Sequence, residues 1–312
     1  MKRKKCLIID SMHPSLFSML ENIGWEYDYK PDISVNEIKT ILPGYDGLIV
    51  RSKTTVDCDL LGNSPTVRFV GRAGAGVDNV DVDYLKEKNI QIIHAAEGNR
   101  DAVGEFTIGL LLALMRNIPR ADNQVRNYVW DREGNRGEEL NGKTVALIGY
   151  GNMGQAFAKR LTGFGCKVLA FDKYKSGYAS IICEEVRMEM IFEQADILSL
   201  HIPLTAETRR MVDTHYLNCF KKSVIVLNTA RGEIVSLSAL ANAIESGKVR
   251  GAALDVLENE KLNTLSIDQK QALEYLKSRS NVIFTPHIAG WTYESHVKIN
   301  VALIEKIKVL DV

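Results

Sequence analysis

The chain has 312 residues, and at roughly 150 residues per domain this length predicts two domains. Hydrophobic residues make up 46% and charged residues 25%, which is ordinary for a globular protein and excludes a disordered chain, a collagen and a small disulfide scaffold. The 39 basic and 39 acidic side chains give a net charge of zero, so we expect neither nucleic acid nor an anionic membrane as a partner.

The five cysteines are widely separated and odd in number, without a C-x-x-C pair, so we expect neither a metal site nor a disulfide framework. Reduced thiols of this kind favour a cytoplasmic location. The basic start of the chain precedes an apolar run that ends at Asp10, which is too short for a signal peptide. The longest apolar stretch, residues 106–115, falls short of the roughly 20 residues of a spanning helix, so we interpret it as a buried helix.

Short apolar runs alternate with helical patterns along the chain in two series. The strands predicted in the first series are residues 6–9, 47–50, 67–70 and 90–93. The strands predicted in the second series are residues 144–148, 167–171, 197–200, 224–227, 251–254 and 282–284. Most of these runs are rich in Val, Ile and Leu without strict alternation, as in strands covered on both faces. Repeated strand–helix–strand order predicts an α/β fold with mostly parallel sheets.

A long helical pattern over residues 101–130 separates the two series, and a polar, glycine-rich loop over residues 131–137 follows it. We predict the domain hinge near this point. A helical pattern over residues 291–310 ends the chain, and this helix is a candidate to return to the first domain.

A glycine-rich turn, Gly149-Tyr-Gly151-Asn-Met-Gly154, lies between the predicted strand 144–148 and a predicted helix. That context is the one a dinucleotide-binding fingerprint requires. Gly149 makes the tight turn, Gly151 lets the backbone approach a pyrophosphate, and Gly154 allows close packing of helix on strand. The free N–H groups of the helix N-terminus then bind the phosphates.

Asp172 ends the next predicted strand, about 20 residues beyond the third glycine, as the fingerprint expects. Its carboxylate would accept hydrogen bonds from both ribose hydroxyls and repel a 2′-phosphate. We therefore predict NAD as the cofactor. Lys173 and Lys175 follow directly, so NADP is disfavoured and not excluded.

Three chemically useful side chains follow strands of the second series: Arg231, Glu260 and His287. Ligands bind at the carboxyl ends of strands in open α/β sheets. A guanidinium there grips a carboxylate with two parallel hydrogen bonds, and a Glu–His pair is a workable acid–base set. His201, which also ends a strand, is the nearest rival to His287 as the catalytic base.

The first domain carries a succession of small residues, Gly74, Ala75 and Gly76, directly after a predicted strand. Backbone N–H groups exposed by such residues form an anion-binding nest. Arg51 and Arg72 also follow strand ends, either as anion-binding groups or as solvated surface charges.

Together these motifs resemble the D-isomer-specific 2-hydroxyacid dehydrogenase family over nearly the whole chain. The residues that carry the resemblance are 48–52, 71–81, 111–119, 139–144, 149–154, 201–205, 228–232, 251–256 and 286–287. The resemblance implies a catalytic set of Arg231, Glu260 and His287. It implies cofactor contacts at Ala75, Gly149, Gly151, Asn152, Met153, Gly154, Asp172, His201, Pro203, Thr229, Ala230, Asp255 and Gly290. It implies substrate contacts at Arg51, Ser52, Arg72, Gly74, Ala75, Gly76 and Arg132.

The resemblance also implies two doubly wound parallel-sheet domains, with a Rossmann-type NAD domain inserted in a flavodoxin-like substrate domain. We expect the substrate domain over residues 1–98 and 291–312, the NAD domain over residues 99–290, and a homodimer formed through the NAD domain. The chain ends near its last helix, so we expect no serine-binding regulatory domain.

Three features depart from the family pattern. Lys261 follows Glu260 where the family usually has Pro, and the stretch 261–286 is long, with a helical pattern over 267–277. Trp291 stands in a segment where the phosphoglycerate enzymes of the family have small residues, and it is expected to narrow the pocket.

The activity expected from the resemblance is NAD-dependent oxidation of D-3-phosphoglycerate to 3-phosphohydroxypyruvate, a step of serine biosynthesis. One alternative is a glyoxylate or hydroxypyruvate reductase, or another D-2-hydroxyacid dehydrogenase. The other is an NAD-sensing binding protein like the corepressors of this family. An assay of turnover discriminates the enzyme from the binding protein.

Overall fold

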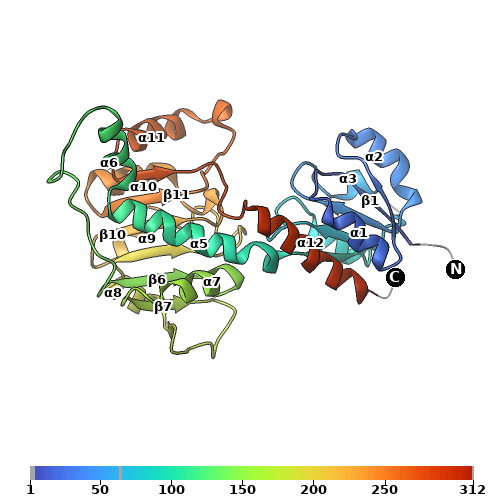
Figure 1. Ribbon diagram of the computed structural model, residues 1–312, viewed down its shortest axis with the longest axis horizontal. Helices are drawn as coiled ribbons and strands as arrows, with labels where there is room; N and C mark the ends of the chain where they lie inside the picture. The colour runs from blue at the N-terminus through green and yellow to red at the C-terminus, as the bar shows by residue number, and fades with distance from the viewer. Residues whose placement is uncertain (1–3, 63–64, 311–312) are drawn as a thin grey trace. The chain divides into compact units, whose positions relative to one another are not determined.

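The computed structural model describes residues 4–62 and 65–310, and it divides into two compact units (Figure 1). The chain leaves the first unit after Arg100, forms the second over Asp101–Gly290, and returns to the first at Trp291. The first boundary lies slightly later than residue 98, the bound expected from the resemblance, and falls inside helix α5 (Ala96–Met115). The hinge predicted near the loop 131–137 is wrong, because that loop lies within the second unit.

The first unit is a parallel five-stranded sheet with the order β2-β1-β3-β4-β5. Its strands are β1 (Lys5–Ile8), β2 (Glu26–Tyr29), β3 (Gly47–Val50), β4 (Phe69–Arg72) and β5 (Gln91–His94). One face is covered by α1 (Ser15–Asn22) and α12 (Tyr293–Lys308). The other is covered by α2 (Val35–Ile41), α3 (Cys58–Leu61) and α4 (Val82–Glu87). This strand order is that of a flavodoxin-like doubly wound sheet.

Helix α12 belongs to the first unit although it ends the chain. Its buried Asn300 donates hydrogen bonds to the carbonyl of His13 at 3.0 Å and to Ser15 Oγ at 2.9 Å. Its Lys306 donates to the carbonyl of His94 at 2.7 Å and pairs with Glu97. The apolar face between these anchors packs into the core of the first sheet.

The second unit is a parallel seven-stranded sheet with the order β12-β11-β10-β9-β6-β7-β8. Its strands are β6 (Thr144–Ile148), β7 (Lys167–Phe171), β8 (Glu184–Glu185), β9 (Ile197–Leu200), β10 (Val224–Asn228), β11 (Val249–Leu254) and β12 (Val282–Phe284). Strand order reverses at β6 and β9, which makes the edge beside them the ligand-binding crevice of a Rossmann-type sheet.

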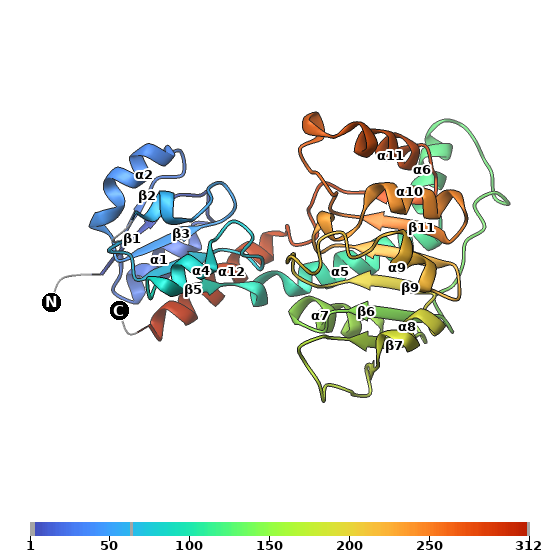
Figure 2. The same ribbon diagram turned by 180° about the vertical axis from the view of Figure 1, so that it is seen from behind.

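Helices cover both faces of this second sheet. On one face lie α5 and α7 (Asn152–Leu161), and Figure 1 shows them in front of the strands. On the other lie α8 (Met188–Gln194), α9 (Thr214–Cys219), α10 (Leu237–Glu245) and α11 (Ile267–Lys277), which Figure 2 shows from behind. The expected fold class of two doubly wound parallel sheets is thus confirmed.

Two strands and one helix break escaped the sequence analysis. Strands β2 and β8 lie at sheet edges, are short and polar, and lack the apolar run that marks a buried strand. The predicted helix over 101–130 is divided at Asn117, whose φ of 54° ends α5 before α6 (Ile118–Arg126) begins. Among the described residues no single helix has the length and apolarity to cross a membrane, and only α5 and α6 taken together across a 62° bend meet that test.

Candidate active site

Three neighbouring strands of the second unit deliver the predicted catalytic residues. Arg231 follows β10, Glu260 follows β11, and His287 follows β12, and these strands are adjacent and parallel. Parallel neighbours end at the same edge of a sheet, so all three residues lie at its carboxyl edge.

Glu260 and His287 form a pair at that edge. The Nδ1 atom of His287 lies 2.9 Å from Oε1 of Glu260, and both side chains are about half exposed. A carboxylate on Nδ1 fixes the tautomer and leaves Nε2 as the reacting nitrogen. The arrangement is therefore suited to proton transfer at Nε2.

The turn that carries His287 is organised by Asp255, a carboxylate that is only 1% exposed at the end of β11. Its Oδ1 accepts hydrogen bonds from Thr285 Oγ1 at 2.6 Å and from the N–H of Ile288 at 2.9 Å, and its Oδ2 accepts from the N–H of Ala289 at 2.8 Å. His287 itself has a φ of 57°, an uncommon conformation for a residue with a Cβ. The buried carboxylate compensates this strain by holding both sides of the turn.

The turn that carries Arg231 is held by a second buried polar residue. The side chain of Asn228 accepts from the N–H of Ala230 at 3.0 Å and donates to the carbonyl of Arg231 at 2.9 Å. Gly232 follows, and a Cβ at this position would lie 1.8 Å from the carbonyl oxygen of Leu257. The Arg231 turn thus packs directly on the backbone that leads to Glu260.

The loop around Glu260 has its own anchors. The carboxylate of Glu258 pairs with Arg210 at 2.6 Å and accepts from the N–H of Leu237 at 2.9 Å. The Asn259 side chain closes the turn around Glu260, because it accepts a hydrogen bond from the N–H of Lys261 at 3.0 Å. Asn259 also donates to the carbonyl of Thr264 at 3.2 Å, so hydrogen bonds hold this turn.

The glycine fingerprint joins β6 to α7 at the same edge and fits a bound dinucleotide. A Cβ at Gly149 would lie 2.5 Å from the carbonyl of His201, and one at Gly154 would lie 2.2 Å from the carbonyl of Gly149. A Cβ at Gly151 would meet no atom within 4 Å, so this glycine faces open space. Helix α7 begins there without a side-chain cap, which leaves its first N–H groups for phosphate oxygens.

Asp172 ends β7 beside this turn. Its carboxylate accepts from the N–H of Tyr150 at 2.9 Å, of Tyr174 at 2.9 Å and of Lys175 at 3.1 Å. A carboxylate fixed in this way can still accept ribose hydroxyls, because each oxygen has more than one lone pair. Lys173 forms an ion pair with Glu207, so its charge is less available to bind a 2′-phosphate.

His201, the rival base, sits in a different environment from His287. Its Nε2 lies 2.9 Å from Ser199 Oγ, and its ring packs on Phe157. Burial lowers the pKa of His201 to about 4, so its imidazole is neutral at physiological pH and is a poor proton acceptor. This environment favours His287 as the base.

The other predicted cofactor positions of the second unit lie on loops that follow its strands. Thr229 follows β10, and its hydroxyl lies 3.1 Å from that of the buried Thr107 in α5. The remaining positions at this edge are Asn152, Met153, Pro203, Ala230 and Gly290.

The first unit places its predicted substrate residues after β3 and β4. Gly74 has a φ of 151°, and within the described chain the N–H groups of Ala75 and Gly76 have no hydrogen-bond acceptor. Those free donors are what an anion nest requires. The guanidinium of Arg72 lies against Gly74, where a Cβ would be 1.6 Å from Nη1.

Arg51 and Ser52 follow β3 in the same unit. The N–H of Arg51 donates to Asp10, and its guanidinium stacks on the ring of Trp291 at 4.5 Å from the centroid. Ser52 is exposed. The structure therefore places Trp291 against Arg51, a contact that the sequence analysis missed because the two residues are far apart in the chain.

Arg132 does not join the other predicted residues within this chain. It lies on the exposed loop after α6. This loop ends where the N–H of Glu138 donates a hydrogen bond to the carbonyl of Met115, and the chain then continues to the start of β6. That position is at the amino ends of the strands, opposite to the edge that carries Arg231. The sequence match of this loop position gave no information on its place in space.

The chain is similar to known proteins over most of its length. The profile of "D-isomer specific 2-hydroxyacid dehydrogenase, NAD binding domain" matches residues 108–289. The hydroxypyruvate reductase of Thermotoga maritima is 39% identical over 272 residues, which are 87% of each chain. The D-3-phosphoglycerate dehydrogenase of Methanocaldococcus jannaschii is 34% identical over 310 residues, and the match spans 97% of the present chain but 57% of that enzyme. Among solved structures, D-lactate dehydrogenase from Aquifex aeolicus with NAD and lactic acid superposes with a TM-score of 0.82 at 27% identity, covering 98% of this chain and 94% of that one.

Proposed function

The chain belongs to the D-isomer specific 2-hydroxyacid dehydrogenase family, and from this membership we propose that it oxidises D-3-phosphoglycerate to 3-phosphohydroxypyruvate with NAD. The observation that carries the chemistry is the Glu260–His287 pair at 2.9 Å, at the sheet edge where Arg231 also lies. Curated phosphoglycerate dehydrogenases at 34% identity over nearly the whole chain support the substrate.

In the proposed reaction, Arg231 binds the substrate carboxylate through two parallel hydrogen bonds. His287 Nε2 takes the proton of the C2 hydroxyl, while Glu260 orients the imidazole and stabilises its charged form. NAD, when bound, supplies the acceptor for the hydride that leaves C2. In the reverse direction the imidazolium returns the proton to the carbonyl oxygen.

The first unit carries anion-binding groups of its own. The free N–H groups of Ala75 and Gly76 suit a carboxylate, and Arg51 and Arg72 suit the phosphate. Charge-assisted bonds to phosphate contribute roughly 1.5–3 kcal/mol each, so Arg51→Ala should reduce kcat/KM for 3-phosphoglycerate about ten- to hundredfold. Turnover of glyoxylate, which has no phosphate, should barely change. Equal losses on both acids would contradict a phosphate-binding role for Arg51.

The second candidate is reduction of hydroxypyruvate or glyoxylate. The hydroxypyruvate reductase of Thermotoga maritima favours it, because its identity of 39% exceeds that of the phosphoglycerate enzymes compared. A spectrophotometric screen of 2-hydroxy and 2-oxo acids with NAD and NADH decides between the two. We expect the highest kcat/KM with the phosphorylated pair, and no turnover of that pair would move the function to the second candidate.

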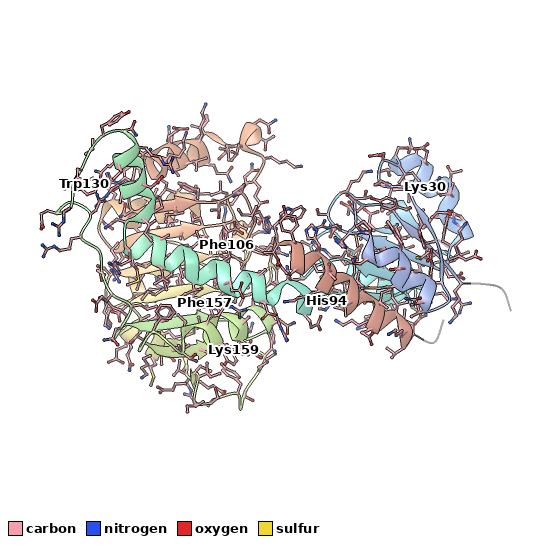
Figure 3. All side chains as sticks on the ribbon, viewed as in Figure 1. Lys30, His94, Phe106, Trp130, Phe157 and Lys159 are labelled. Carbon is pink, nitrogen blue, oxygen red and sulfur yellow. The ribbon has the colours of Figure 1, made fainter. Side chains whose placement is uncertain are left out.

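We also propose that the protein acts as a cytoplasmic homodimer assembled through the second unit. Large apolar side chains are exposed on and after α6: Ile118 is 54% exposed, Val125 53%, Tyr128 100% and Trp130 80%. Figure 3 labels Trp130 on the loop that extends away from the sheet. Trp130→Glu should shift the mass measured by light scattering from dimer to monomer. The control Ile181→Glu, at a residue exposed elsewhere on the unit, should not. A monomeric wild-type protein would contradict the assembly.

A further inference from the structure

Trp291 and Arg51 form a stacked pair in the first unit. The Cζ atom of Arg51 lies 4.5 Å from the centroid of the Trp291 ring. Arg51 follows β3, so its guanidinium lies at the carboxyl edge of the first sheet, whereas Trp291 immediately precedes α12. Only the fold brings these two residues together.

The indole of Trp291 also contacts a histidine ring. The ring of His296 lies 4.8 Å from that of Trp291 in an edge-to-face arrangement with an interplanar angle of 90°. Burial, and after it the neighbouring Arg51 and His13, lower the pKa of His296, which favours its neutral imidazole. His296 stands in the first turn of α12, which begins with a reciprocal capping box between Thr292 and Ser295.

The helix that carries this arrangement is anchored to the sheet. Asn300 in α12 donates to the carbonyl of His13 and to Ser15, at the start of α1. The loop just before these residues contacts Arg51 as well, because Arg51 Nη1 donates to the carbonyl of Ser11 at 3.4 Å and the Arg51 N–H donates to Asp10. The position of Trp291 is therefore set by the same elements that set the backbone of Arg51.

Stacking has a definite consequence for the guanidinium. The indole occupies one face of the planar group and uses none of its N–H donors. The contact restrains rotation about the long side chain. Within the described chain, Nη1 has only the long bond to Ser11, so the guanidinium has donors to spare.

We propose that Trp291 is a positioning residue that holds the Arg51 guanidinium for an anionic group of the substrate, and so sets the preference for acids with a second anion at C3. The identity of that anion as a phosphate rests on the proposed function. An anchored guanidinium loses less conformational entropy when it binds than a freely rotating one, and the gain appears in substrate affinity. The rate of hydride transfer is not expected to depend on this contact.

The test is a double-mutant cycle of Trp291→Leu and Arg51→Ala, with KM and kcat measured for 3-phosphoglycerate and for an acid without a second anion. Trp291→Leu should raise KM for 3-phosphoglycerate about three- to tenfold and leave kcat within about twofold. Trp291→Phe keeps an aromatic face and should recover most of the affinity. In the Arg51→Ala background, Trp291→Leu should have no further effect. Tyr293→Leu is the matched control, since Tyr293 is 93% exposed at the start of the same helix.

The outcomes separate this inference from the proposed function. Equal KM changes on both acids, additive effects in the cycle, or the same loss in Tyr293→Leu would overturn a positioning role for Trp291. If the wild-type protein does not turn over 3-phosphoglycerate, the proposed substrate is wrong, and the cycle is run on the acid of the screen that carries another anion at C3 and is turned over best. A KM effect of Trp291→Leu that vanishes without Arg51 still supports the inference there, and an effect independent of Arg51 refutes it.

Discussion

Substitution of Gly232 by Ala tests whether the spacing of the catalytic groups depends on one backbone contact. The added Cβ would lie 1.8 Å from the carbonyl oxygen and 2.0 Å from the carbonyl carbon of Leu257. Ordinary contacts of a Cβ begin at 3.4 Å, and neither partner is a flexible side chain. The two backbone segments must therefore separate by about 1.5 Å, because a packed interior has no free space to absorb the methyl group.

This displacement acts on Arg231, one residue before the glycine, and on Glu260, three residues after Leu257. A misplacement of about 1 Å costs roughly 100-fold in rate, or about 2.7 kcal/mol of transition-state stabilisation. We expect Gly232→Ala to reduce kcat/KM at least 100-fold, measured with NAD and the preferred acid. Overpacking costs about 1–3 kcal/mol of stability, so the thermal midpoint should fall by only several degrees.

Gly163→Ala is the matched control, because a Cβ at Gly163 meets no atom within 4 Å and its φ lies outside the left-handed region. It should keep wild-type activity. Near-normal kcat/KM in a folded Gly232→Ala protein would refute the reasoning, since the contact with Leu257 would then have no influence on the reacting groups.

Three further predictions concern single side chains. Asp172→Ala should narrow the ratio of kcat/KM for NAD over NADP at least tenfold, because it removes the charge that repels a 2′-phosphate, and an unchanged ratio would contradict the ribose-binding role. Glu260→Gln should lower kcat about ten- to hundredfold with KM for NAD unchanged, because His287 loses the charge that stabilises its imidazolium, and unaltered kcat would exclude that role. Burial lowers the pKa of His201 to about 4 from an unfolded value of roughly 6.5, so the unfolded chain binds more protons between these values. The stability contribution of His201 is complete above pH 6.5 and falls by about 2 kcal/mol at pH 5. His201→Asn should accordingly make the thermal midpoint less dependent on pH between pH 7 and pH 5. The same pH dependence in the variant and the wild-type protein would argue against a lowered pKa of His201.

The parts of the fold that the sequence predicted are those in which local chemistry and tertiary structure agree. The strand before Gly149 is apolar on both faces because helices cover both faces of the sheet, and the fingerprint glycines are needed for backbone contacts within a short segment. Edge strand β2, with the sequence Glu26-Tyr-Asp-Tyr29, lacks that signal because one edge is open to solvent. The break at Asn117 was missed because a single residue with positive φ leaves no periodic trace in the sequence.

The sequence predicted the candidate catalytic residues of the site, but it did not predict the residues that hold their turns in place. Arg231 and His287 follow strongly apolar strands, and a charged residue at a strand end is visible in the sequence. Asn228 and Asp255 also end strands, which was the available signal, but their hydrogen bonds to the turns depend on backbone geometry that the sequence does not specify. The contact of Arg51 with Trp291 requires two distant segments to be placed together, and no local pattern contains that information.

Stability and chemistry at this edge are assigned to different residues. The ion pair of Glu260 with His287 is about half exposed, and pairs of that kind contribute about 0–1 kcal/mol to folding. The value of this pair to the protein therefore lies in the reaction and not in folding. Asp255 is buried, and all of its described acceptor bonds go to the turn around His287, so removing the carboxylate would leave buried donors unsatisfied at about 1–3 kcal/mol each. Glu260 and His287 can remain exposed to substrate because the turn that carries His287 is held by the buried carboxylate of Asp255. That carboxylate takes no part in the proposed proton transfer and keeps its hydrogen bonds.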